Sequence, residues 1–167
     1  MKLIIIGKGD SLFGQNLSKI KVEKWGLNDA VNNFKCDRKI SWDKNQKPTG
    51  IPFDTIKPHG GKWINEGNYL RRKPGYVANF NSSLLFAINL AIQREFKEIY
   101  LLGFDNSLGK MKFYDNYNKA VYLNLFNLIN RWCKIFEKGL IDEKVFVVEG
   151  GIESFKHISY EQFIDIS

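Results

Sequence analysis

The chain has 167 residues, of which 44% are hydrophobic and 14% aromatic, and its formal net charge is +7. This size and apolar content indicate a single packed globular domain. The sequence contains no low-complexity tail. No apolar run approaches the roughly 20 residues that span a bilayer, and no signal-peptide pattern opens the chain, so we expect a cytoplasmic protein without membrane contact. Cys36 and Cys133 lack metal-ligand spacing, and we expect two reduced thiols. The positive charge suits a polyanionic partner, although many basic proteins carry such charge only for solubility.

Short apolar runs that end in glycine or polar residues are typical of buried parallel strands. Such runs occupy residues 2–6, 22–27, 38–42, 98–102 and 144–148. Helical patterns cover residues from 10 or 11 to 18, residues 30–34, a segment that begins after Ser83, and residues 117–138. Alternating strands and helices predict an α/β fold: a Rossmann-like, doubly wound, mostly parallel sheet in one domain over residues 1–167, with the first strand central.

The first strand runs into a glycine-rich loop, "GKGDSLFG". Its glycines, Gly7, Gly9 and Gly14, do not have the dinucleotide-binding spacing, which needs the third glycine three residues after the second. A phosphate loop of the Walker type is excluded because no Gly-Lys-Ser/Thr follows. The loop is still suited to an anion, because glycines allow close backbone approach and Lys8 carries a positive charge.

Polar and small residues also follow the other expected strands, and the carboxyl ends of parallel strands meet at one edge of a sheet. We therefore predict a nucleotide site in the crevice there. Its candidate residues are Gly7, Lys8, Gly9, Asp10, Ser11, Asn28, Asp29, Asp43, Asn81, Ser82, Ser83, Gly103, Asp105 and Asn106.

Residues 43–79 hold all four prolines of the chain and several glycines, and we expect a lid or acceptor-binding loop there. Basic groups alternate with aromatic rings in this segment, as in proteins that neutralise phosphates and stack on bases. The candidate acceptor-binding residues are Trp63, Tyr69, Arg71, Arg72 and Lys73. The alternative is an ordinary solvent-exposed loop without a binding role.

The segments "IIIGKGDSL", "WGLND" and "NSSLLFAINLAIQREFKEIYLLGFD" occur in an order that resembles glycosyltransferase family 42, the bacterial sialyltransferases. The order also resembles related flagellin-modification and hydroxymethylpterin diphosphokinase-like proteins and small phage proteins. The closing "ESFKHISYEQF" resembles the ending of that phage group. The resemblance implies a Rossmann-like fold and a site for a nucleotide-activated sugar.

By this resemblance, Gly7, Gly9, Ser11 and Asn28 line the donor pocket, Ser82 and Ser83 meet the nucleotide phosphate or sugar, and Gly103 and Asp105 form the floor. Tyr114 and Tyr117 fall where the family has two tyrosines. The chain departs from the family at Lys8, Asp10 and Ser83, and no histidine follows "GFD" until His157. The identity of the general base is therefore open.

The bases available for deprotonating an acceptor hydroxyl are Asp105 and Asp29 first, then Asp43 and His59. Without a D-x-D motif we expect no metal and no cofactor, so Lys8, Arg71, Arg72, Tyr114 and Tyr117 would hold the leaving phosphate. The predicted function is a metal-independent glycosyltransferase that uses a nucleotide sugar, with a hydroxymethylated base of phage DNA as the candidate acceptor. The alternatives are a non-catalytic nucleotide-binding protein and a pyrophosphoryl transferase; the oligomeric state stays open.

Overall fold

A computed structural model describes residues 1–12, 14–41, 50–55, 62–63, 76–77, 83–104, 144–149 and 155–166 of the chain. The strands of its main sheet are β1 (Lys2–Ile6), β2 (Glu23–Leu27), β3 (Arg38–Ser41), β4 (Phe53–Thr55), β7 (Glu98–Leu102), β8 (Val145–Val148) and β9 (Lys156–Ile158). The helices are α1 (Ser83–Gln93) and α3 (Tyr160–Ile166), with 3-10 turns η1 (Asp10–Leu12), η2 (Leu17–Lys19) and η3 (Asn28–Asn32). Two short strands, β5 (Lys62–Trp63) and β6 (Tyr76–Val77), pair separately.

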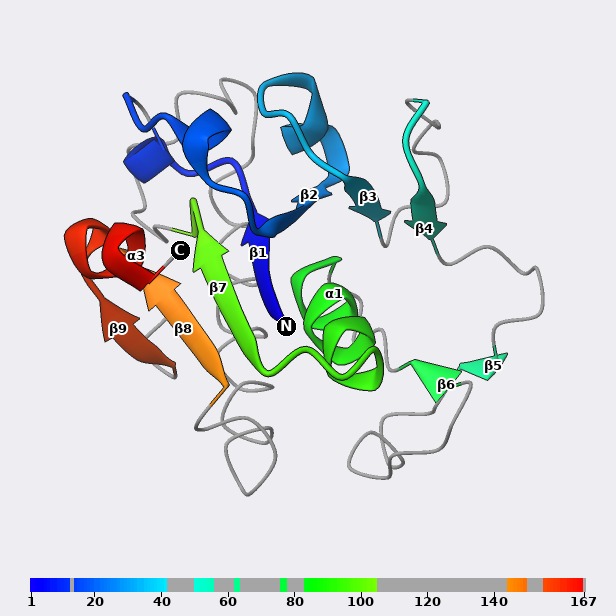
Figure 1. Ribbon diagram of the computed structural model, residues 1–167. Coiled ribbons are helices and arrows are strands. Elements are labelled where there is room, and N and C mark those ends of the chain that lie inside the picture. Colours follow the sequence, from blue (N-terminus) through cyan, green and yellow to red (C-terminus); the bar gives the residue numbers. More distant parts are fainter. Residues whose placement is uncertain are drawn as a thin grey trace, which may run out of the picture.

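The main sheet has the order β4-β3-β2-β1-β7-β8-β9, and every neighbouring pair is parallel. Strand β1 lies between β2 and β7, and Ile6 is in register with Gly26 on one side and Leu102 on the other. The chain builds outward from β1 to one edge and then returns beside β1 to build toward the other edge (Figure 1). The predicted Rossmann-like α/β fold with a central first strand is confirmed.

Apolar side chains of β1 alternate between two cores, one on each face of the sheet. Leu3 and Ile5 belong to the core that contains the buried face of α1. Ile4 and Ile6 belong to the other core, where Phe163 of α3 is fully buried. Both faces are thus covered, which explains why β1 reads as a continuous apolar run (Figure 1).

The connections after β1 and β2 differ from the helices that the sequence predicts. Residues 10–18 form no single helix: η1 and η2 are separate turns, and Gly14 between them has a φ of +81°. Asn16 caps the second turn, because its side chain accepts a hydrogen bond from the Ser18 amide over 3.1 Å. The expected helix at 30–34 is instead η3, which begins at Asn28. The long helix expected at 117–138 lies outside the described residues.

Strand β4 was not predicted, and it lies inside the segment that the sequence marks as a lid. It is the edge strand beside β3, with Ile40 in register with Asp54. Arg38 of β3 donates to the Asp54 carboxylate over 2.7 Å, and Arg94, just after α1, donates over 3.2 Å. Residues 53–55 are therefore part of the sheet and are tied to α1, which corrects the picture of an irregular segment.

Both arginines of this group also contact an aromatic ring. The guanidinium carbons of Arg38 and Arg94 lie 6.0 and 5.2 Å from the centre of the Trp25 ring. The indole N–H of Trp25 donates to Glu23 over 2.7 Å. Cations over the face of a tryptophan are attracted by its quadrupole, so ring and charges together fix this corner of the sheet.

Among the described residues, no helix combines the length and apolar character that crossing a membrane requires.

Candidate functional site

The site begins where β1 and β7 end side by side, because the direction of strand addition reverses between these two strands. In open α/β sheets this topological switch point is the usual ligand position. The Gly7 amide donates to the Leu102 carbonyl over 2.8 Å, and the Gly9 amide donates to the Gly103 carbonyl over 2.8 Å. The two loops are thereby joined, and the sequence-predicted residues Gly7, Gly9 and Gly103 meet.

Glycine is required in this joint for steric reasons. A Cβ on Gly7 would lie 2.5 Å from the Gly103 carbonyl oxygen. A Cβ on Gly103, whose φ is +74°, would lie 2.4 Å from Leu12 Cδ1 and 3.1 Å from the Gly9 nitrogen. The amides of Gly7 and Gly9 already donate to protein carbonyls, so these two amides hold the loops together and do not point at a ligand. This differs from the anion cradle that the glycine pattern suggests.

Lys8 supplies the positive charge of the site. Its ammonium nitrogen lies 3.3 Å from Oδ2 of Asp29, and the side chains are 12% and 48% exposed, respectively. The cation is therefore largely buried, while its carboxylate partner faces solvent on one side. Because Asp29 is the second residue of η3, just after the end of β2, this ion pair links the ends of two neighbouring strands.

Asn28 connects three further elements. Its side-chain oxygen accepts hydrogen bonds from the hydroxyls of Ser41, over 2.6 Å, and Ser83, over 3.0 Å. Asn28 has a φ of +52°, a left-handed conformation that asparagine tolerates better than most residues. Ser41 ends β3 and is fully buried, and Ser83 is the first residue of α1. The ends of β2 and β3 and the start of α1 are thus held together.

We call Lys8, Gly9, Asn28, Asp29, Ser83 and Gly103 the switch-point site. Ser41 and Phe104 also belong to this region and were missed in the sequence. The available signal for Ser41 was its position near the end of the predicted strand 38–42, whereas the Phe104 ring, 3.0 Å from a Cβ built on Gly7, had none.

Three further predicted site residues lie among the described residues outside this group. Asp10 and Ser11 follow in η1. Trp63 is in β5, which pairs with β6 in a separate two-stranded sheet. The residues outside the described part are Asp43, His59, Tyr69, Arg71, Arg72, Lys73, Asn81, Ser82, Asp105, Asn106, Tyr114 and Tyr117.

In the described ranges, no group of three or more His, Cys, Asp or Glu side chains is arranged to hold a metal ion. The only carboxylate that the described switch-point site contains is Asp29, which is paired with Lys8. What this arrangement offers a ligand is a buried cation, a half-exposed carboxylate and the start of a helix. Comparisons of the chain with protein-family models, with curated proteins and with solved structures gave no match.

Proposed function

We propose that the switch-point site binds the phosphate of a nucleotide-linked sugar and that the protein is a metal-independent glycosyltransferase. The observation that carries the proposal is the largely buried Lys8 side chain after the central strand, with its ammonium group beside Asp29. Burying a cation is unfavourable unless it is paired, and an anionic ligand at this point would bring further negative charge to Lys8. The choice of a glycosyltransferase activity also depends on the resemblance of the sequence to glycosyltransferase family 42.

The helix α1 supports the same assignment. It begins at Ser83, whose hydroxyl bonds to Asn28, so its N-terminal end is held beside the strand ends. The helix dipole carries partial positive charge at its N-terminal end, which favours a negative charge there. In the proposed complex the donor phosphate therefore lies between Lys8 and the first turn of α1.

Asp29 is the described residue best suited to be the base. The oxygen of the acceptor hydroxyl attacks the anomeric carbon, while the bond from that carbon to the donor phosphate oxygen breaks and its electron pair stays on the phosphate. The hydroxyl proton passes to the Asp29 carboxylate. Lys8 would then turn from Asp29 toward the leaving phosphate, which keeps a cation next to the charge that develops there.

The acceptor that we propose is a hydroxymethylated base in phage DNA. The formal charge of +7 and the basic, aromatic-rich stretch within residues 43–79 support a polyanionic acceptor. A base inside a duplex must be flipped out before it can react, and stacking side chains such as Trp63 would assist this. A protein that binds a nucleotide without transferring sugar is the second candidate.

The test is a thermal-shift screen of sugar nucleotides, followed by turnover of whichever donor binds. Binding at about 100 times Kd should stabilise the protein by about 2.7 kcal/mol. Lys8→Gln should abolish the shift, whereas Lys97→Gln, an exposed lysine before β7, should leave it intact. Asp29→Asn should retain binding and lose turnover. Binding without turnover in the unaltered protein would favour the second candidate, and no shift with any donor would contradict both.

A further inference from the structure

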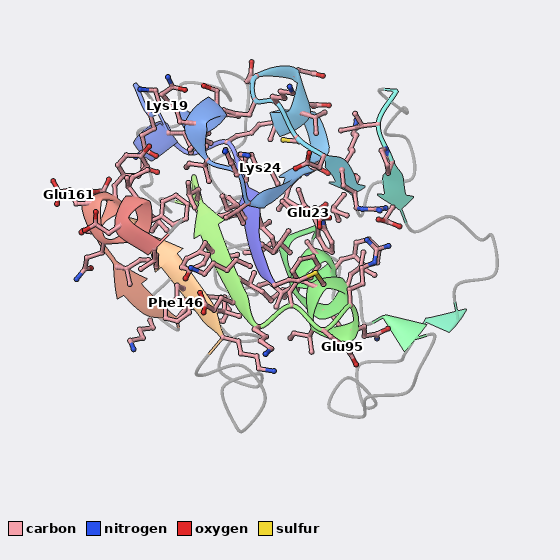
Figure 2. The ribbon with its side chains drawn as sticks, in the orientation of Figure 1. Lys19, Glu23, Lys24, Glu95, Phe146 and Glu161 are labelled. Carbon is pink, nitrogen blue, oxygen red and sulfur yellow. The ribbon has the colours of Figure 1, made fainter. Side chains whose placement is uncertain are left out.

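A second site lies at the amino ends of β2 and β3, at the edge of the sheet opposite the switch-point site. It is a groove of about 880 Å³, a volume within the range of small-molecule sites. Its lining comes from two stretches, residues 15–24 and 33–37. Lys19 and Lys24 mark the first of these stretches in Figure 2.

The groove is apolar on one side, and an unpaired acceptor is buried beneath its lining. Leu17, Ile20, Val22 and the Phe34 ring line it. The side-chain oxygen of Gln15 is buried and has no hydrogen-bond donor within the part of the chain that the structure describes. Buried polar atoms almost always have a partner, so this oxygen would gain one if the Gln15 side chain turned toward a ligand that brings an N–H or O–H group into the groove.

The acidic side chains of the groove are engaged by the protein itself. Glu23 accepts the indole N–H of Trp25 over 2.7 Å. Asp37 accepts the Lys24 amide over 2.8 Å, and its own amide donates to the Lys24 carbonyl over 2.8 Å. The Lys24 ammonium in turn donates to the carbonyls of Ile20 and Val22. These contacts make the walls rigid without using the exposed cations.

Each of the two stretches contributes one exposed lysine to the lining: Lys21 in the first and Lys35 in the second. They are suited to an anionic group at the mouth, and phosphate is the anion that lysine commonly binds. The groove thus combines two exposed lysines, an apolar wall and an unpaired acceptor buried beneath the lining.

We propose that this groove binds a nucleoside phosphate whose base carries an amino group, such as cytosine or adenine. The ring packs against Phe34, the phosphate contacts Lys21 and Lys35, and the exocyclic N–H₂ donates to the Gln15 oxygen once that side chain turns toward the groove. Free nucleotides and single-stranded nucleic acid share this chemistry, and both serve as probes. The proposal is independent of the proposed function, because the switch-point site is at the other edge of the sheet.

The experiment is an amide chemical-shift titration of ¹⁵N-labelled protein with CMP and, separately, with an oligodeoxycytidylate. We expect the amides of Ser18, Asn33 and Lys35 to shift at the groove. Signals of Gly9 and Gly103 report the switch-point site, so occupation of each site is seen separately. The Lys8→Gln variant should keep the groove shifts, which separates a failure of the proposed function from a failure here.

Variants then test the individual contacts. Lys21→Gln with Lys35→Gln should raise the Kd for CMP about tenfold and lower the oligonucleotide salt slope by roughly 1.4. The control is Lys97→Gln with Lys144→Gln. It removes the same number of positive charges at the amino ends of the strands but outside the groove lining, so the Kd for CMP and the salt slope should stay unchanged. Both lysines of the test pair are exposed, so loss of folding is not expected.

Gln15→Leu should weaken CMP binding about tenfold while leaving the melting temperature unchanged or higher, because it removes an unpaired buried oxygen. Ribose 5-phosphate, which lacks the base, should bind more weakly than CMP and be insensitive to Gln15→Leu. Absence of groove shifts with both CMP and the oligonucleotide would overturn the proposal. Equal binding of ribose 5-phosphate and CMP would overturn the recognition of a base.

Discussion

The hydroxyl of Ser83 donates a hydrogen bond to the side-chain oxygen of Asn28 over 3.0 Å, and these residues are 55 positions apart in the chain. The bond joins the end of β2 to the start of α1. Ser41, at the end of β3, donates to the same oxygen over 2.6 Å. One asparagine thus holds three elements whose ends form the switch-point site.

Two substitutions of Asn28 should separate its hydrogen bonds from its backbone conformation. Asn28→Gly keeps the left-handed conformation and removes both hydrogen bonds, at an expected cost of about 1–3 kcal/mol. Asn28→Ala loses the same bonds and should cost about 1 kcal/mol more, since alanine disfavours a φ of +52°. Urea unfolding measures both. Equal stabilities of the two variants would show that the conformation contributes nothing.

Gly103→Ala should destabilise the fold by about 2–4 kcal/mol, through backbone strain and overpacking against Leu12. Gly14→Ala is the control, because its φ of +81° is similar and its added Cβ has nothing within 4 Å. The control should lose only about 1 kcal/mol. Equal losses by urea unfolding would mean that the contact between the β1 and β7 loops has no packing role.

Asp54→Asn should lower the free energy of unfolding by about 1–2 kcal/mol at low salt, because Arg38 and Arg94 lose their shared carboxylate. The loss should shrink as salt is added, since all three side chains are partly exposed. Glu95→Gln removes an exposed carboxylate that forms no ion pair with the described residues, and it should change stability little. An Asp54→Asn loss that is independent of salt would point to packing instead.

Burial raises the pKa of the Cys36 thiol from 9.0 to about 12, and the neighbouring Asp37 carboxylate adds to the shift. The folded protein therefore keeps the proton that the unfolded chain releases between these pH values, and stability should fall as the pH rises through this window. Cys36→Ala should show a shallower fall in the same interval. Native Cys36 should also resist alkylation at pH 8, as peptide mass spectrometry would show. Rapid alkylation of the folded chain would contradict the burial.

Much of the central fold was determined by local sequence patterns. The apolar runs of β1 and β7 were predicted with their observed bounds, Lys2–Ile6 and Glu98–Leu102. The helical stripe that begins after Ser83 was also confirmed, as α1. Burial on both faces of a strand and the 3.6-residue period of a helix leave a signature in neighbouring residues. The joint appearance of Lys8, Asn28, Asp29 and Ser83 at one edge followed from the same patterns.

Only the tertiary structure decided how these residues are bonded and where the sheet ends. The edge strands β4 and β9 have three paired residues each, too few for a periodic signal, and partners supply their hydrogen bonds. The use of the Gly9 amide by the Gly103 carbonyl, the pairing of Lys8 with Asp29 and the unpaired oxygen of Gln15 are likewise invisible in the sequence. Hydrogen-bond partners come from residues distant in the chain, so three-dimensional packing selects them and no local pattern encodes them.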